Sequence, residues 1–229
     1  MRLAIIPARG GSKRIPRKNI KPFLGKPILA YSIAAARASG CFDTVMVSTD
    51  DEEIATVARA HGAEVPFLRD AETASDTATT AAVLLEVLQR YCAQGEDFAQ
   101  ACCIYPTAPF VTAEKLRGSL TMLTEGAYDS VISMVRYSFP IQRALERVGE
   151  RVAFVSPEFA LSRSQDLAPR FHDAGQWYWF DVPTFEREKR LFSANTAGYE
   201  LSELEVQDID SETDWQIAEL KCRYALGQR

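Results

Sequence analysis

The sequence of 229 residues lacks the long hydrophobic runs that cross membranes. No apolar stretch approaches the roughly 20 residues that a bilayer-spanning helix needs. The N-terminus is a short apolar segment followed closely by charges, which is not the pattern of a secretory signal peptide. We therefore expect a cytoplasmic protein that has no membrane partner.

Cysteine is scarce, and its spacing indicates neither a zinc site nor a redox motif. The cysteines number five, an odd count, and no two of them form a C-x-x-C pair. They lie in apolar segments, and free cysteine is commonly buried. We expect buried thiols at Cys41, Cys92, Cys102, Cys103 and Cys222.

Three glycine-dependent motifs are also missing. The chain has neither the G-x-x-x-x-G-K-[ST] loop of P-loop NTPases nor the G-x-G-x-x-G turn of dinucleotide-binding proteins. It also has no G-x-S-x-G nucleophile elbow. These absences disfavour an NAD(P)-dependent oxidoreductase and a serine hydrolase.

Charge is unevenly distributed along the chain. The formal net charge is −5, which argues against general nucleic-acid binding. However, the first 42 residues contain nine basic residues and no acidic one. A basic N-terminal segment on an acidic protein predicts a local anion site.

Strand-like and helix-like segments alternate between residues 3 and 135. Short apolar segments predict strands buried on both sides, and the longer segments between them predict helices. This alternation is typical of an α/β fold with a mainly parallel sheet and helices on both faces. The expected strands are 3–6, 44–47, 64–68, 102–105 and 130–135, and the expected helices are 27–38, with Pro27 in its first turn, 51–61, 77–91 and 113–124.

The alternation stops after residue 135. Residues 137–172 contain several prolines and few apolar runs, which indicates an insertion or a swapped arm. An aromatic strand is expected at 176–180 and a closing helix at 213–226. We therefore divide the chain into a main α/β domain, formed by 1–136 and 173–229, and an inserted arm, 137–172.

Three unusual loops follow expected strands, namely residues 7–13, 48–51 and 105–109. Ligands bind beyond the carboxyl ends of parallel strands, so we expect these loops to converge. In the first loop, Gly10 and Gly11 would let the backbone approach a phosphate closely. Arg9 would clamp phosphate oxygens, with Lys13 and Lys18 as point charges. The alternative is a solvated basic loop.

Acidic residues elsewhere admit two interpretations each. Asp50 and Asp51, like Ser75 and Asp76, are candidates for helix caps or for site residues. Asp208 and Asp210 alternate, so on a strand both carboxylates would share one face and suit Mg²⁺ together with substrate phosphates. The alternative is an acidic strand end that caps the last helix.

A family resemblance emerges from these motifs together. The chain resembles the cytidylyltransferases that activate nonulosonic acids, including the CMP-N-acetylneuraminate synthetases, over nearly its whole length. The segments that carry the resemblance are Ile6-Pro-Ala-Arg-Gly-Gly-Ser-Lys13, Lys18-Asn19, Val47-Ser-Thr-Asp50, Ala74-Ser-Asp-Thr77, Pro106-Thr107 with Pro109, and Asp208-Ile-Asp210.

The resemblance implies a fold and a set of roles. The fold would be a Rossmann-like α/β domain of the nucleotide-diphospho-sugar transferase type, with a dimerisation arm that reaches the active site of a partner in a homodimer. CTP would be held by Ala8, Arg9, Gly10, Gly11, Ser12, Lys13 and Lys18 around its phosphates, and by Asn19, Arg69, Ala78 and Thr80 around cytosine and ribose. One or two Mg²⁺ ions would lie on Asp208 and Asp210. A nine-carbon acidic sugar would lie near Tyr105, Thr107, Arg163, Gln165, His172, Asp173, Gly175, Gln176 and Tyr178.

Two departures from the sialic-acid members concern the sugar. Those members have Gln before Pro-Thr, where this chain has Tyr105. They also have Arg-Pro-Asn-Gly where this chain has His172-Asp-Ala-Gly175. Both segments, together with Arg163-Ser-Gln-Asp-Leu167, look more like those of the family members that act on pseudaminic acid.

The resulting hypothesis is a CTP-dependent activation of pseudaminic acid with release of diphosphate, for bacterial surface or flagellar glycosylation. Arg9, Lys18, Asp208 and Asp210 would be the catalytic residues, and no protein base is obvious. The same chemistry on N-acetylneuraminate, legionaminate or Kdo is the nearest alternative. A nucleotide sensor that binds without turnover is the alternative outside the enzymes.

Overall fold

The computed structural model describes residues 1–225, so Leu226, the expected last residue of the closing helix, lies outside the described part. Its centre is a six-stranded sheet in the order β10-β6-β9-β5-β1-β4. All neighbouring pairs are parallel except those of β9, which runs antiparallel to β5 and β6. The strands are β1 (Arg2–Pro7), β4 (Thr44–Ser48), β5 (Gln100–Ile104), β6 (Ser130–Arg136), β9 (Phe171–Asp181) and β10 (Thr196–Leu201).

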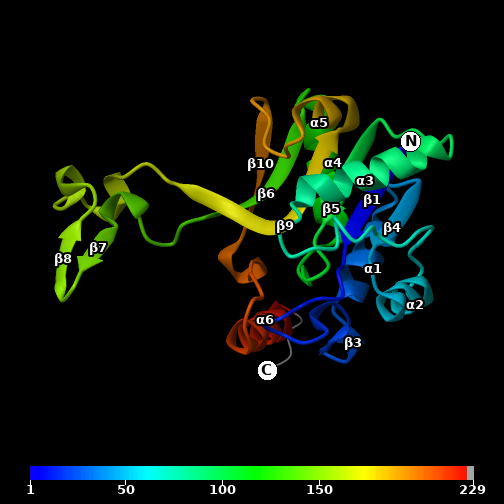
Figure 1. Cartoon of the computed structure of the whole chain (residues 1–229). Helices are drawn as coiled ribbons and strands as arrows, with labels where there is room; N and C mark the ends of the chain where they lie inside the picture. Colours follow the sequence, from blue (N-terminus) through cyan, green and yellow to red (C-terminus); the bar gives the residue numbers. More distant parts are fainter. Residues whose placement is uncertain (226–229) are drawn as a thin grey trace.

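Helices cover both faces of this sheet (Figure 1). One face packs against α1 (Leu29–Ser39), α2 (Glu52–Ala60) and α4 (Ala113–Glu125), and the other against α3 (Thr80–Ala93) and α5 (Val182–Glu188). Successive side chains of a strand point to opposite faces, so Ile6 of β1 packs into the first layer and Ile5 into the second. Both are fully buried, as the apolar strand pattern predicts.

A third apolar cluster joins the two ends of the chain. The small hairpin of β2 (Pro22–Phe23) and β3 (Lys26–Pro27) packs against α6 (Glu212–Ala225). Phe23 and Trp215 meet edge to face, with ring centroids 5.4 Å apart. Because η1 (Lys18–Ile20) directly precedes this hairpin, the cluster fixes the basic N-terminal loop relative to the C-terminal helix.

The segment between β6 and β9 projects from the main body as an arm (Figure 1). It carries the hairpin of β7 (Leu145–Val148) and β8 (Arg151–Phe154). Its short 3₁₀ turns are η2 (Ile141–Arg143), η3 (Pro157–Phe159) and η4 (Ser164–Asp166), and a fifth, η5 (Glu203–Glu205), follows β10 in the main body. The mainly parallel α/β architecture is thus confirmed.

Several local expectations were wrong. The strand expected at 64–68 is only a bridge between Glu64 and Met46, because Pro66 has no N–H with which to continue a ladder. Pro27 belongs to β3 instead of a first helical turn. Helix α3, which was expected to begin at residue 77, begins at Thr80 and is capped by the Thr79 hydroxyl, not by Ser75 or Asp76. Cys92 is exposed, whereas the other four cysteines are buried.

Other differences concern the second half of the chain. The elements β7, β8, α5 and β10 were not anticipated, and β9 is longer than the aromatic segment 176–180. Residues 206–210 form no strand, so strand alternation does not place Asp208 and Asp210. Their positions are set by Ile209, which lies between them. Ile209 is buried in the third apolar cluster, which leaves its two neighbours facing away from the core.

Candidate active site

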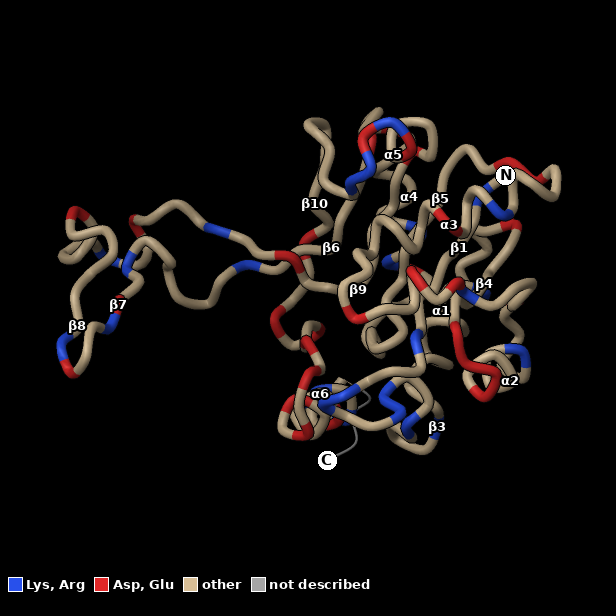
Figure 2. Tube along the Cα trace, in the orientation of Figure 1, with Lys and Arg blue, Asp and Glu red and all other residues tan. Residues whose placement is uncertain are grey.

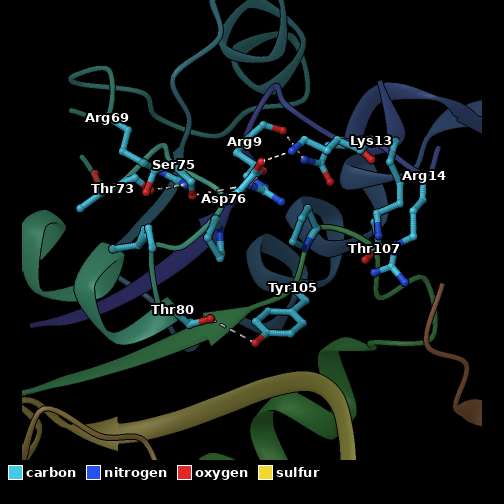
Figure 3. Close-up of a pocket in the computed structure, with 17 residues that line it drawn as sticks. Arg9, Lys13, Arg14, Arg69, Thr73, Ser75, Asp76, Thr80, Tyr105 and Thr107 are labelled. Carbon is cyan, nitrogen blue, oxygen red and sulfur yellow. Dashed lines mark hydrogen bonds and ion pairs between the residues drawn. The ribbon is translucent and has the colours of Figure 1, made fainter. Parts of the chain in front are cut away.

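The loops after β1, β4 and β5 meet at one edge of the sheet, as expected from the carboxyl ends of parallel strands. The loops after β1 and β5, together with residues 69–80, border a cavity of about 580 Å³, which we name the nucleotide cavity after the ligand expected from the sequence (Figure 3). Its lining combines basic, hydroxyl and amide side chains with a few apolar ones. The lining residues are Pro7, Arg9, Ser12, Lys13, Arg14, Lys18, Asn19, Arg69, Thr73, Ser75, Asp76, Ala78, Thr80, Val83, Tyr105, Pro106 and Thr107.

Main-chain contacts fix the loop after β1. The Gly10 N–H donates to an Asp50 carboxylate oxygen at 2.9 Å, and the Asn19 amide donates to the Arg9 carbonyl at 2.9 Å. A Cβ atom at Gly10 would lie 2.8 Å from Asp51 Oδ2, so a side chain there would push the loop away from α2. Asp51 itself caps α2 by accepting from the Ile54 N–H, as one interpretation predicted.

Two cations of this loop are held by a carboxylate from another loop. Arg9 donates to Asp76 at 2.5 Å, and Lys13 pairs with the second oxygen of the same carboxylate (Figure 3). These contacts, with Lys13 first, lower the pKa of Asp76. An anion therefore already occupies the position where the basic loop was expected to bind phosphate.

The basic loop also reaches the C-terminal acidic segment. Lys18 Nζ donates to the Ile209 carbonyl at 2.7 Å and lies 3.5 Å from Asp210 Oδ1. Arg14 pairs with Asp210 at 2.7 Å, and Lys21 pairs with Glu212 at 2.6 Å. In Figure 2 the basic positions of this loop lie beside the acidic start of α6.

Asp208 and Asp210 flank the buried Ile209. Loss of hydration, and then repulsion by Asp210, raise the pKa of Asp208. Within residues 1–225, no three His, Cys, Asp or Glu side chains are grouped so that they could hold a metal ion. The aspartate pair therefore offers a partial set of hard oxygen ligands, which suits a cation that also takes phosphate oxygens.

The far end of the nucleotide cavity is lined by a buried arginine. Arg69 is 8% exposed and donates to the Ser48 hydroxyl at 3.1 Å and to the Ser48 carbonyl at 2.6 Å. Burial lowers its pKa, although the side chain stays cationic at neutral pH. Because both of its Ser48 contacts anchor it to β4, Arg69 presents a fixed set of donors to this end of the cavity.

A second cavity of about 540 Å³, the acceptor cavity, adjoins the first. Tyr105 lines both cavities. The other residues of the acceptor cavity are Val135, Arg136, Tyr137, Ser138, His172, Asp173, Ala174, Gly175, Tyr178, Glu203, Val206, Gln207, Asp208 and Lys221. Asp208 therefore lies on the acceptor side, while Lys18 lies on the nucleotide side.

An irregularity in β9 shapes the acceptor cavity. The pairing with β6 shifts between Asp173 and Tyr178, and the Ser133 hydroxyl accepts from the N–H groups of both Gln176 and Trp177. Gly175 takes up the turn with a φ of +63°, a conformation that glycine adopts readily. Such bulges often redirect side chains beside active sites, and here the bulge turns residues 172–175 toward the cavity.

Not all expected residues line a cavity. Ala8 is buried in the core, Gly10 is partly buried beside Asp51, and Gly11 is exposed but lines neither cavity. Gln176 is 2% exposed, because its amide donates to the Glu205 carbonyl at 2.6 Å. Thr107 lines the nucleotide cavity, not the acceptor cavity.

Two of the expected sugar residues lie on the arm, and a third, His172, lies beside Asp173. Arg163 pairs with Asp166 at 2.7 Å, and Gln165 lines a separate cavity of about 240 Å³ at the base of the arm. Neither lines the acceptor cavity of its own chain. His172 lines that cavity, but its Nδ1 lies 2.9 Å from the Asp173 main-chain oxygen, so the two side chains form no catalytic dyad.

Several residues at the two cavities were not expected there from the sequence. Arg14 lies in the basic run and could have been found by its charge alone. Asp76 was a candidate helix cap or site residue, but its contacts with Arg9 and Lys13 were not anticipated. Arg136 and Lys221 are single cations in apolar or amphipathic segments, and nothing in their sequence context marks them as cavity residues.

Comparisons with known proteins show which family the chain resembles. A family model described as cytidylyltransferase matches residues 3–206. The chain is 38% identical to a pseudaminic acid cytidylyltransferase of Campylobacter jejuni over 95% of this chain and 94% of that one. It is 32% identical to the CMP-N,N'-diacetyllegionaminic acid synthase of Legionella pneumophila over 95% of this chain and 94% of that one.

A solved structure supports the fold independently of sequence. The structure of a CMP:2-keto-3-deoxy-manno-octonic acid synthetase complexed with CTP aligns over 99% of both chains with a TM-score of 0.71. The sequence identity is only 17%, so this likeness concerns the fold alone. It confirms the nucleotidyltransferase type of α/β fold.

Proposed function

This chain belongs to the cytidylyltransferase family, and from that premise we propose that it transfers the CMP group of CTP to pseudaminic acid and releases diphosphate. The observation that carries the proposal is the pair of adjoining cavities. One cavity is lined by the basic loop, and the other is bordered by Tyr105 and the bulge of β9. The choice of pseudaminic acid rests on the Campylobacter relative and on the two departures from the sialic-acid pattern, at Tyr105 and at 172–175.

The reaction is a single in-line displacement at phosphorus. The anomeric hydroxyl of the sugar attacks the α-phosphorus of CTP and loses its proton to solvent, a new O–P bond forms, and the bond to the oxygen of the departing diphosphate breaks. Such transfers need little covalent participation by the protein, so catalysis is positioning together with charge stabilisation. Arg9 and Lys13 would stabilise the departing diphosphate once Asp76 has left them, and Lys18 would act beside them.

A divalent cation fits the proposed site. Asp208 and Asp210 would hold Mg²⁺ together with phosphate oxygens, and the bound ion would relieve the repulsion by Asp210 that, after burial, helps to raise the pKa of Asp208. When bound, the ion would supply positive charge to the phosphate oxygens. Arg14, which now pairs with Asp210, would be free to turn toward the triphosphate.

The acceptor cavity offers groups suited to an acidic, amide-bearing sugar. Arg136 and Lys221 supply positive charge for the carboxylate, and Asp173 has oxygens that accept from N–H and O–H groups. His172 and Tyr178 supply ring surfaces beside them. We assign these roles as parts of the same proposal.

We also propose a homodimer in which the arm covers the partner. Large apolar side chains are exposed along the arm, among them Phe139 at 84%, Val148 at 74% and Leu161 at 97% exposure. A second copy of the chain would bury these side chains, and exposed apolar surface larger than usual marks interaction sites. A dimer would bring Arg163 and Gln165 to an acceptor cavity that they do not reach in their own chain.

CTP is made in the cytoplasm, so we place the reaction there, ahead of surface or flagellar glycosylation.

The experiment that tests the proposal is a panel of nonulosonic acids mixed with CTP and Mg²⁺. Pseudaminic acid should release diphosphate fastest, ahead of N,N'-diacetyllegionaminate, N-acetylneuraminate and Kdo. Faster release with another sugar would reassign the acceptor while keeping the chemistry. Binding of CTP with no release for any sugar would favour the nucleotide sensor instead.

A further inference from the structure

Tyr105 is the wall that the nucleotide cavity and the acceptor cavity share. Both main-chain polar groups of Tyr105 are hydrogen-bonded. The Tyr105 N–H donates to the Gln176 carbonyl at 2.8 Å, and the Ser32 hydroxyl donates to the Tyr105 carbonyl at 2.8 Å. The backbone is therefore fixed, and only the ring and its hydroxyl can respond to what fills either cavity.

The nucleotide side reaches Tyr105 through the start of α3. Thr80 is the first residue of that helix, and its hydroxyl lies 3.3 Å from the Tyr105 hydroxyl (Figure 3). Thr80 follows a loop that is anchored at its beginning, where Glu86 accepts from the Asp70 N–H at 3.0 Å and from the Thr73 hydroxyl. Because its beginning is anchored, displacement of the later part of this loop would move Thr80.

Asp76, in the later part of that loop, competes with any anion for the cations of the basic loop. The Asp76 carboxylate is bound by Arg9 and Lys13. A triphosphate offers the same two cations a stronger anion. Binding of the nucleotide must therefore displace Asp76 and move the segment that leads into Thr80.

The acceptor side of Tyr105 is equally well connected. Its ring packs against that of Tyr178, with centroids 5.4 Å apart. Tyr178 is 2% exposed and donates from its hydroxyl to Asp173 Oδ2 at 2.7 Å. The other oxygen of Asp173 accepts from the Gly175 N–H at 2.8 Å, which ties this pair to the bulge of β9.

We propose that Tyr105 is a positioning residue that couples the two cavities, so that a bound nucleotide strengthens sugar binding through the hydroxyls of Thr80 and Tyr105 and the ring of Tyr178. This inference rests on the proposed function, because it takes CTP and the sugar as the two ligands. The coupling is reciprocal by thermodynamic necessity, so the sugar strengthens nucleotide binding by the same factor. If the two cavities adjoined without coupling, neither ligand would change the dissociation constant of the other.

The test is a binding cycle with a ligand pair that cannot react. The dissociation constant of pseudaminic acid is measured by calorimetry, with and without saturating α,β-methylene-CTP, in wild type and in Tyr105→Phe. The ratio of the two constants is the coupling. We expect about fivefold or more in wild type, within the usual range for coupled sites, and a ratio near one in Tyr105→Phe. Because a ratio is compared, a change in the affinity of either ligand alone does not affect the result.

Two further variants complete the design. Thr80→Val removes the other hydroxyl and should also bring the ratio near one, which decides the matter if Tyr105→Phe folds poorly. Tyr91→Phe is the matched control, because Tyr91 is a 2% exposed tyrosine on the same helix and its hydroxyl has no partner among the described residues. This control should keep the wild-type ratio.

The possible outcomes separate the coupling from the function. A wild-type ratio near one, or an undiminished ratio in both hydroxyl variants, overturns the coupling. Diphosphate release from CTP and pseudaminic acid by the wild-type enzyme is measured alongside. Release without coupling refutes this inference alone, whereas the absence of release with every sugar refutes the proposed function.

Discussion

The side-chain amine of Lys18 donates a 2.7 Å hydrogen bond to the carbonyl oxygen of Ile209, although 191 positions separate the two residues. The bond joins the basic N-terminal loop to the segment that carries Asp208 and Asp210. Phe23, Trp215 and Ile209 pack together in one buried cluster, which holds the two segments beside each other. The proposed phosphate-binding and metal-binding groups therefore form one unit, held by the two ends of the chain.

Replacement of Arg9 should abolish most of the turnover. In Arg9→Ala we expect kcat/KM for CTP to fall on the order of 10³-fold, because a cation that stabilises charge in the transition state is lost. The fold should persist, since Arg9 is partly exposed and its side-chain contacts are all to residues 75 and 76. Steady-state diphosphate release checks the rate, and circular dichroism checks the fold. Arg223→Ala, an exposed arginine on α6, is the control. Turnover close to wild type in Arg9→Ala would remove Arg9 from the phosphate site.

Replacement of Asp210 should weaken the response to magnesium. Asp210→Asn keeps the shape but removes a charged oxygen ligand, so the Mg²⁺ concentration that gives half-maximal rate should rise about tenfold or more. The measurement is a Mg²⁺ titration of diphosphate release at saturating CTP and sugar. Glu212→Gln, two positions away on the same acidic segment, is the control and should leave the titration unchanged. An identical titration in Asp210→Asn would exclude this residue as a ligand.

Removal of the charge at Asp76 should help the nucleotide to bind. The carboxylate now competes with phosphate for Arg9 and Lys13, so Asp76→Asn should tighten CTP about two- to fivefold at low salt, the range typical of exposed ion pairs. The gain should shrink at higher ionic strength, because exposed charges are screened. Calorimetric titration with α,β-methylene-CTP at two salt concentrations measures both effects. Weaker binding in Asp76→Asn would show that Asp76 contributes to the nucleotide site instead of obstructing it.

The extent to which sequence foretold this structure differs between the two halves of the chain. The parallel strands up to β6 could be predicted because strands buried on both faces are continuously apolar, as in Leu3 and Ile5. β10 was missed because its residues are only partly buried and include Gly198, so its apolar pattern is weak. The strand expected at 64–68 failed because hydrophobicity alone does not show that Pro66 lacks an N–H.

The candidate site shows the same division. The loop residues Arg9, Lys13 and Lys18 could be found because local charge and glycine content distinguish them. The contacts of Asp76 with Arg9, and of Gln176 with Glu205, join residues 67 and 29 positions apart. No local pattern encodes such pairs, because tertiary packing alone brings them together. Gln176 was therefore placed in the sugar site by resemblance, whereas the fold buries it behind that site.

The last prediction concerns stability at low pH. Asp51 caps α2 and pairs with Arg17 at 2.5 Å, and the hydrogen bond from Arg17 is the main cause that lowers the pKa of Asp51 from its ordinary 3.8 to about 2. A carboxyl group whose pKa is lower in the folded state stabilises the fold above its unfolded pKa, and that contribution disappears as pH falls from about 4 to 2. Asp51→Asn should therefore lower the free energy of unfolding by about 1 kcal/mol at pH 7, since Asn still caps a helix while the ion pair is lost. Urea unfolding at pH 7, 5, 4 and 3 should show the difference between wild type and variant shrinking only below pH 4. A difference that is already absent at pH 5, or one that persists unchanged at pH 3, would contradict the assignment of the lowered pKa to Asp51.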